Sequence, residues 1–471
     1  MKKANIQPET YLPEGIGGDA QRGGTRRNCF MFLGEIASIC MLFKIHTTDY
    51  QIVTKKEGAK SFPPFSSFFP SIFLRGWSIF PPFCGKRCGN RGIILSFNPY
   101  YMQYLKGLNS LRFFAAFFVL AGHARIDLAN LDVSHVTWPV LYLGSDAVHF
   151  FFALSGFLLT YLALEEFEKA GTLNIRRFFL KRILRIWPLY YLCVLLGFVV
   201  LAIVVPYTEG KPFLAFTVPE GLPYYLFFLP NYIVSVHMVN SVGALYALWS
   251  IGVEEQFYLF FPFLMLRVLK SRRPVLLIAL VTVAYTAFYY LQFYGFFNTA
   301  VATSAFINTL KFQFMFYGCL GAVLYKKKPA FIAKLLPDKR RTQAILLLLM
   351  GVVVFFTVPV NYAVYSIATG LLYVCFIINT FSATQHVINF ERPWLSYLGK
   401  ITYGIYMFHP YLAYPLRYAI MKFGFVKQVF TIVPVLYYIV LLGLTIGVAH
   451  LSYKYFESRF LRLARRKVQP G

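Results

Sequence analysis

The sequence predicts an all-α integral membrane protein: a bundle of about ten transmembrane helices with one re-entrant or interfacial segment. Of its 471 residues, 58% are hydrophobic and only 14% are charged, a balance that water-soluble chains do not have. Beyond residue 106 the apolar residues gather in runs of about 20, the length of a helix that crosses a bilayer. The basic residues gather in the short loops between these runs, a pattern typical of cytoplasmic loops of membrane proteins.

Residues 1–101 differ from the rest of the chain. They are rich in Gly, Pro, Ser and Arg, and their apolar stretch from Cys29 to Phe43 is short and interrupted by Glu35. A cleaved signal peptide would carry its apolar region much closer to the start. We expect no folded domain here, but either an extension upstream of a natural start at Met102 or a disordered or membrane-surface arm. N-terminal sequencing of the native protein distinguishes the two.

The membrane domain is expected over residues 102–461, followed by a basic cytoplasmic tail over 462–471. Its expected spans run at 107–128, 140–164, 184–206, 247–268, 274–294, 305–325, 343–361, 363–382, 395–417 and 429–453. Basic clusters follow the second, fourth and sixth spans and end the chain, at 176–185, 267–273, 326–341 and 459–467. All four clusters lie on one side if both termini are cytoplasmic, as the positive-inside rule requires of a protein in the cell membrane.

The stretch from Leu222 to Met238 is apolar but is not counted as a span. As a span it would move every later basic loop to the wrong side of the membrane. Pro223, Pro230 and Asn231 favour a broken helix instead. We therefore expect a re-entrant or interfacial segment, whose irregular backbone must be buried in protein or line a cavity.

The formal net charge is +27, from 46 Lys and Arg against 19 Asp and Glu. Nucleic-acid binding would need a phosphate-binding face, whereas short basic loops fit the positive-inside rule, so the expected partner is the lipid bilayer and not nucleic acid. Cys84 and Cys88 have no matching second pair and the histidines are scattered, so we expect no metal site.

Arg112 and His123 open and nearly close the apolar stretch LRFFAAFFVLAGHA of the first span. They lie roughly 16 Å apart along a helix axis, about half the hydrocarbon thickness of a membrane. An ionisable group inside a span costs about 2.5–3.5 kcal/mol on insertion scales, and less for neutral His. Either Arg112 anchors at the interface and His123 bonds a neighbouring helix, or both take part in chemistry. The predicted orientation places His123 toward the outer half of the membrane.

The second and third spans carry two further polar patterns. In FFALSGF, Ser155 and Gly156 allow a close helix approach and a hydrogen bond between helices, and packing alone is the alternative explanation. In RRFFLKRILRIW, Arg182 and Arg185 share a helix face at the cytoplasmic side. Two forked guanidinium groups suit phosphate oxygens, whereas positive-inside anchoring is the alternative for this pair.

The fourth span contains ALWSIGVEEQFYLFFPFL, with Trp249 and Ser250 ahead of Glu254, Glu255 and Gln256. Two adjacent glutamates inside a membrane helix are expensive, and packing does not account for them. Adjacent positions point about 100° apart, so the two carboxylates are expected to have different partners. The predicted orientation places both near the outer part of the span, at the depth of the first-span histidine.

The ninth span, LSYLGKITYGIYMFHPYL, places Gly399, Tyr403, Tyr406 and His409 in one helix. The pair His409-Pro410 either lines a cavity or fills a structural kink, because proline frees a backbone carbonyl.

Together these five stretches resemble the membrane acyltransferase-3 family, whose members move acyl groups, usually acetyl, onto extracytoplasmic sugars. The resemblance covers Tyr104 to Leu461. It includes an Arg and a His ten residues apart, Ser-Gly-Phe after a Phe pair, and Arg-x-x-Arg. The most specific match is Trp-Ser-x-x-Val-Glu-Glu-Gln-Phe from Trp249 to Phe257.

The resemblance implies an acyl-coenzyme A donor, with acetyl favoured, and no permanently bound cofactor. The donor phosphates would dock on Arg182 and Arg185, with Arg112 helping to bind the donor. The residues implied in catalysis are His123, as general base or transient acyl carrier, and Glu254 or Glu255, orienting its imidazole. The residues expected to line the substrate cavity are Ser155, Trp249, Ser250, Gln256, Tyr406 and His409.

On this interpretation the protein is a multi-pass O-acyltransferase acting on an extracytoplasmic carbohydrate, without the fused esterase-like domain that some family members carry. The rival is a transporter or flippase for a sugar or lipid-linked glycan, which would also use intramembrane charges and a broken helix. Transporters often carry internal repeats, and the Glu-Glu-Gln stretch has no counterpart in the other half of the chain. A binding or assembly protein of the envelope explains the spans but not the buried charges.

Overall fold

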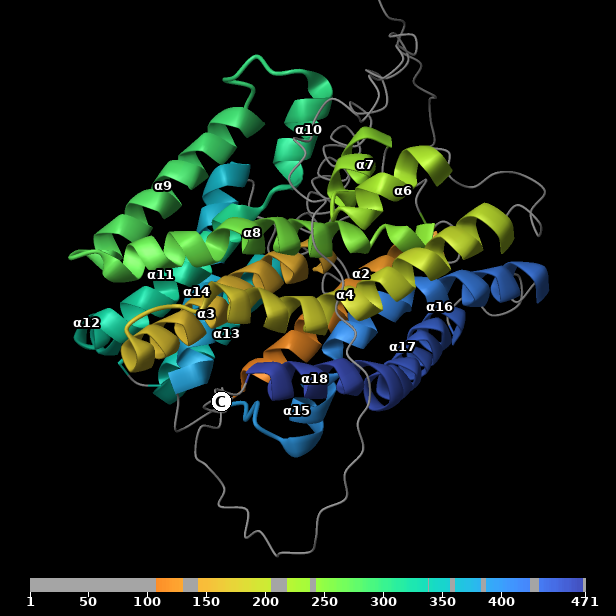
Figure 1. Cartoon of the computed structure of the whole chain (residues 1–471). Coiled ribbons are helices and arrows are strands. Elements are labelled where there is room, and N and C mark those ends of the chain that lie inside the picture. The colour runs from red at the N-terminus through yellow and green to blue at the C-terminus, as the bar shows by residue number, and fades with distance from the viewer. Residues whose placement is uncertain are drawn as a thin grey trace, which may run out of the picture. The chain divides into compact units, whose positions relative to one another are not determined.

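The computed structural model describes residues 107–129, 143–204, 218–237, 243–337, 339–355, 361–382, 387–423 and 432–468. These ranges contain helices and no β-strand, as the sequence predicts (Figure 1). The expectations for residues 1–101 lie outside the described residues.

The helices follow the expected spans closely. The first half of the described chain holds α2 (Leu108–Ala129), α3 (Gly144–Ala170), α4 (Ile175–Val199), η3 (Val200–Val204), α6 (Val218–Leu226), α7 (Pro230–His237), η5 (Gly243–Leu245), α8 (Leu248–Lys270) and α9 (Pro274–Phe293). The second half holds α10 (Val301–Thr309), α11 (Phe312–Lys327), α12 (Pro329–Leu335), α13 (Lys339–Phe355), α14 (Tyr362–Ser382), α15 (Pro393–Lys400), α16 (Thr402–Phe423), α17 (Ile432–Ser452), η7 (Tyr453–Glu457) and α18 (Ser458–Val468).

Five stretches of the described residues are long and apolar enough to cross a membrane. They are α3, α4, α9, α14 and the stretch Val433–Arg466, which continues from α17 through η7 into α18. Each of the five overlaps a span expected from the sequence, so the membrane character of the chain is supported. The count of ten spans stays a prediction.

Two expected spans are interrupted. The span expected at 305–325 is divided between α10 and α11, and the one at 395–417 between α15 and α16. At the first interruption the freed carbonyl groups accept hydrogen bonds from two tyrosines of α9: Tyr285 Oη lies 2.7 Å from Leu310 O, and Tyr289 Oη lies 3.2 Å from Asn308 O. Side chains can thus satisfy the backbone where a helix breaks, and hydropathy alone does not reveal such a break.

The stretch from Leu222 to Met238 is a broken helix where the structure describes it, as expected. Helices α6 and α7 are separated at residues 227–229, and Pro230 begins α7. Phe228 adopts the left-handed conformation (φ 57°), and its carbonyl oxygen accepts a hydrogen bond of 2.8 Å from Gln256 Nε2 of α8. A side chain of α8 therefore satisfies this break.

Helices α3 and α11 pack at unusually short range through two glycines. A Cβ atom on Gly156 would lie 2.0 Å from the carbonyl oxygen of Met315, and one on Gly318 would lie 2.0 Å from that of Ala153. Only glycine permits this approach, which is the packing role considered for Gly156 in the sequence. The close contact fixes the side of α3 that carries Ser155.

Candidate functional site

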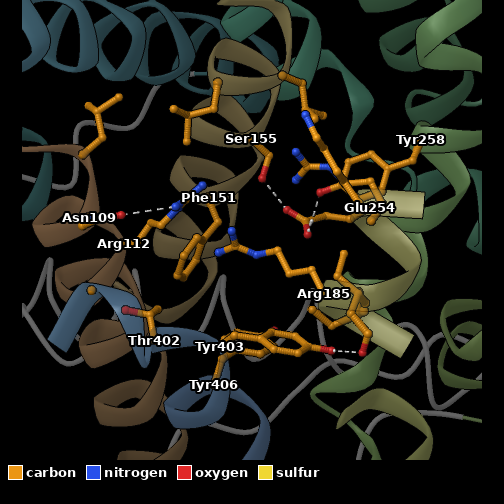
Figure 2. Close-up of a pocket in the computed structure, with 18 of the residues that line it drawn as sticks. Asn109, Arg112, Phe151, Ser155, Arg185, Glu254, Tyr258, Thr402, Tyr403 and Tyr406 are labelled. Atoms are coloured by element: carbon orange, nitrogen blue, oxygen red, sulfur yellow. Dashed lines mark hydrogen bonds between the residues drawn. The ribbon is translucent and has the colours of Figure 1, made fainter. Parts of the chain in front are cut away.

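A cavity of about 520 Å³ lies among α2, α3, α4, α8, α16 and α18 (Figure 2). Its walls combine apolar residues with many polar ones. The polar and charged residues that line it are Asn109, Arg112, Ser155, Lys181, Arg182, Arg185, Ser250, Glu254, Tyr258, Thr402, Tyr403, Tyr406 and Arg465. Seven of the twelve site residues named from the sequence are among them: Arg112, Ser155, Arg182, Arg185, Ser250, Glu254 and Tyr406.

Three arginines from two helices meet in this cavity. Figure 2 shows the side chains of Arg112 and Arg185 directed toward one another across it. The guanidinium of Arg182 lies 5.8 Å from the ring centre of Phe178 and 5.9 Å from that of Tyr258. Arg112 donates one hydrogen bond of 3.4 Å, to the neutral side chain of Asn109. The guanidinium groups are thus held by rings and neutral groups, and most of their N–H donors remain available.

Glu254 is the one acidic residue among those that line the cavity in the described part of the chain. Its Oε1 accepts a hydrogen bond of 2.6 Å from Ser155, and its Oε2 accepts one of 3.1 Å from Tyr258, one turn further along α8. Ser155 therefore has a polar role beside the packing role of Gly156. Its position in the span led us to expect Glu254 on the outer side of the membrane, away from the arginine pair. In the structure Glu254 lines the same cavity as the arginines.

Glu255 points to a different neighbour, as expected for the adjacent position on a helix. Its Oε2 accepts a hydrogen bond of 3.1 Å from the indole N–H of Trp187 on α4. Gln256 turns to a third side, where its amide also donates to Asn231 at 2.7 Å. The three consecutive polar residues thus tie α8 to α3, to α4 and to the α6–α7 break.

Trp249 packs against α3 and does not line this cavity. Its ring lies perpendicular to that of Phe152, with the ring centres 6.3 Å apart. Gln256, Glu255 and the two candidate histidines likewise lie outside the lining residues. For Trp249 and Gln256 the structure gives contacts that stabilise the helices around the cavity.

Ser250 of α8 and Tyr406 of α16 both line the cavity. Their hydroxyl oxygens lie 2.6 Å apart, and Tyr406 also donates to the carbonyl oxygen of Ala247 at 3.2 Å. His409 follows Tyr406 by about one turn of α16, with the ring centres 5.8 Å apart. The ring of Tyr406 therefore contacts both the cavity and a buried histidine.

His409 forms a pair with His123. Nδ1 of His123 lies 2.8 Å from Nε2 of His409, and the rings are stacked with centres 5.0 Å apart. Nδ1 of His409 lies 3.3 Å from the carbonyl oxygen of Ile405. Because a carbonyl only accepts, Nδ1 of a neutral His409 carries the proton and Nε2 accepts from Nδ1–H of His123. This tautomer leaves a free lone pair on Nε2 of His123.

The sequence analysis assigned a glutamate the task of orienting His123. Among the described residues, the hydrogen bonds of Glu254 and Glu255 go to Ser155, Tyr258 and Trp187, and His409 is the partner of His123. Position along a helix does not show which neighbouring helix each carboxylate faces, and the depth expected for the two carboxylates stays a prediction.

Six of the polar residues that line the cavity were not among the site residues named from the sequence: Asn109, Lys181, Tyr258, Thr402, Tyr403 and Arg465. Tyr258 stands four residues after Glu254, a helical spacing that could have indicated the contact. Lys181 and Arg465 belong to clusters interpreted as anchors at the cytoplasmic surface, and no sequence signal separates them from their basic neighbours.

Comparisons with known proteins show the family to which the chain belongs. A protein-family model described as an acyltransferase domain matches residues 105–454. The putative O-acetyltransferase SACOL0978 of Staphylococcus aureus (strain COL) is 26% identical over 378 residues, covering 76% of this chain and 58% of the relative. The O-acetyltransferase OatA of Staphylococcus aureus (strain NCTC 8325 / PS 47) is 25% identical over 380 residues, covering 76% of this chain and 57% of the relative. The chain thus spans less than two thirds of the length of these relatives. No solved structure matches it.

Proposed function

Because the chain belongs to the acyltransferase family whose model covers residues 105–454, we propose that it is a membrane-bound O-acyltransferase. It takes an acyl group, acetyl in the simplest case, from cytoplasmic acyl-coenzyme A. It transfers this group to a hydroxyl of an extracytoplasmic carbohydrate. Relatives named O-acetyltransferases support the reaction class and the acetyl group.

The observation that carries this proposal is the charge of the cavity. Five cations line it, which we call the cavity cations: Arg112, Lys181, Arg182, Arg185 and Arg465. One carboxylate, that of Glu254, lines it as well, so the described lining has a formal charge of +4 (five minus one). Guanidinium groups bind phosphate oxygens in bidentate fashion, and coenzyme A carries three phosphate groups. The cavity therefore suits the nucleotide part of the donor.

We assign the acyl end of the donor to the part of the cavity lined by Ser250 and Tyr406, because the ring of Tyr406 contacts His409. A donor that extends past Tyr406 places its thioester at the His123–His409 pair. Nε2 of His123 takes the proton of the acceptor hydroxyl, while the hydroxyl oxygen attacks the thioester carbonyl. The carbon–sulfur bond breaks as the ester bond forms, and the proton passes to the coenzyme A thiolate. The products are an acylated hydroxyl and free coenzyme A.

In this reaction His409 is a positioning residue, because it holds Nδ1–H of His123 and so fixes the tautomer that can accept a proton. Glu254 lines the same cavity as the arginines and is held by two hydroxyl groups. We assign it to the donor side of the site, where a carboxylate limits the repulsion among the arginines. Glu255 supports the site through its bond to Trp187 on the helix of Arg182 and Arg185.

The test is acyl transfer from labelled acyl-coenzyme A to surface glycan, in a strain that lacks the gene and re-expresses one variant. His123→Ala removes the base, and we expect the transfer rate to fall about 10²- to 10⁴-fold, the range for loss of general-base catalysis. His450→Ala is the matched control, because His450 is a histidine of α17 whose ring bonds Tyr397 at 2.6 Å outside the cavity. It should transfer at the wild-type rate.

Full transfer by His123→Ala would exclude it as the base. Unchanged glycan acylation in the deletion strain, together with altered glycan export, would favour a transporter or flippase. That alternative shares the broken α6–α7 segment and the charged cavity.

A further inference from the structure

Helix α18 lies beyond the part of the chain that the family model matches, which ends at residue 454. It packs along α4, and Figure 1 shows it in dark blue, turned away from the end of α17. The turn is made by the π-helical segment η7, whose last residue, Glu457, is buried and accepts a hydrogen bond of 2.9 Å from Ser452. The direction of α18 is thus set by the fold and not by a free tail.

One face of α18 forms a wall of the cavity. Leu461, Ala464 and Arg465 line it, at the i, i+3 and i+4 positions that share a helix face. Arg459, Arg462 and Arg466 lie on other faces and are not among the lining residues. The basic cluster that the sequence assigned to membrane anchoring therefore has one member with a different environment.

Arg465 meets a second cation from the facing helix. Lys181 of α4 lines the same cavity, next to Arg182 and one turn before Arg185. Arg465 is exposed, whereas Arg112, Lys181 and Arg182 are half-buried. Among the described residues, none of these cations has a carboxylate within ion-pair distance. Two basic helices thus present unpaired charges to one space.

The cavity cations differ in their charged neighbours. The charges of Arg112 and Arg182 act on Glu254, which Ser155 bonds. Lys181 instead has Arg177 and Glu166 as charged neighbours toward the start of α4, and Arg465 lies near the end of α18. If the cations beside Glu254 bind the diphosphate, Lys181 and Arg465 are left for the phosphate on the ribose, the anionic group farthest from the thioester.

We propose that α18 is part of the donor site, and that Arg465 and Lys181 bind the 3′-phosphate of coenzyme A. This inference rests on the proposed acyl-coenzyme A donor and deepens it, because it names a helix outside the family match and the chemical group that the helix recognises. It gives α18 a function in selecting the phosphorylated nucleotide, in place of surface anchoring alone.

The experiment measures equilibrium binding of coenzyme A and of dephospho-coenzyme A, which lacks the 3′-phosphate, to the purified full-length protein in lipid nanodiscs. Arg465→Ala should weaken coenzyme A binding about three- to tenfold, as expected for one partly exposed charge pair, and leave dephospho-coenzyme A binding unchanged. Lys181→Ala should act in the same direction. Arg465→Lys should restore most of the preference.

Arg466→Ala is the matched control, since it removes the same charge from the adjacent position of the same helix but outside the cavity. It should bind both ligands as the wild type does. Equal effects of Arg465→Ala and Arg466→Ala, or an equal loss for both ligands, would overturn the assignment of α18 while the donor proposal stands. A wild-type protein that binds neither ligand would instead overturn the donor proposal itself.

Discussion

Two basic regions of this molecule differ in whether their Lys and Arg side chains form ion pairs. At the end of α3 and α11, which we call the Glu–Lys network, each lysine has a carboxylate partner. Lys326 is paired with Glu165 and lies 3.5 Å from Glu168, which also accepts from Lys327 at 3.0 Å. Around the cavity, five cations face a single carboxylate, and in the described part of the chain none of the five forms an ion pair.

The difference separates charges that hold helices together from charges that are available to a ligand. An ion pair satisfies its own groups and offers little to a third partner, whereas unpaired cations in a half-buried site favour a bound anion. Both regions look alike in the sequence, because each is a cluster of Lys and Arg beside an apolar run. The carboxylate neighbours distinguish them, and those neighbours come from other helices.

The sharpest test of this contrast removes two charges from each region. Arg182→Ala with Arg185→Ala should weaken coenzyme A binding by at least about 100-fold, because each charged hydrogen bond contributes roughly 1.5–3 kcal/mol. Lys326→Ala with Lys327→Ala removes the same charge from the Glu–Lys network and should change the dissociation constant less than about twofold at physiological ionic strength, where distant charges are screened. Similar losses in both double variants would mean that net charge, not the cavity, attracts the donor.

A second test removes the one carboxylate among the described lining residues of the cavity. Glu254→Gln keeps the shape of the side chain but deletes the negative charge beside the arginines. Its amide oxygen can still accept from one hydroxyl group, and its NH2 group can donate to the oxygen of the other. We expect coenzyme A to bind a few-fold more tightly, since an anion no longer has a carboxylate near it. Isothermal titration in nanodiscs measures this. Weaker binding would show that the carboxylate itself holds the donor or keeps the arginines in place.

The smallest expected effect is on stability. Lys326→Ala removes the ion pairs of Lys326 with Glu165 and Glu168 but leaves the Lys327–Glu168 pair and the glycine contact of α3 and α11 intact. Partly exposed ion pairs contribute about 0–1 kcal/mol, so the thermal midpoint should fall by only a few degrees and transfer activity should persist. Arg182→Ala should leave the midpoint nearly unchanged, because Arg182 has no ion pair to lose among the described residues. A larger fall of the thermal midpoint for Arg182→Ala than for Lys326→Ala would mean that the cavity arginine, and not the Glu–Lys network, holds helices together.

The sequence by itself determined the helical membrane character of the chain, the positions of most helices and the break between α6 and α7. It also identified seven of the polar residues that line the cavity. Apolar run length, proline placement and clustered charge are local properties, and local properties are visible in a single chain. The different partners of Glu254 and Glu255 followed from helix geometry in the same way.

Only the tertiary structure decided which of these residues meet. The His123–His409 pair joins residues 286 positions apart, and the Ser155–Glu254 bond joins residues 99 apart. At the helix break next to Lys311, a tyrosine of α9 bonds the carbonyl oxygen of Leu310. The packing of α18 along α4 makes Arg465, and not Arg466, a lining residue. A hydrophobic stripe fixes which residues avoid water, but in a bilayer every face of a helix can be apolar. Which neighbouring helix a polar side chain faces therefore depends on close helix packing, such as the α3–α11 contact at Gly156 and Gly318.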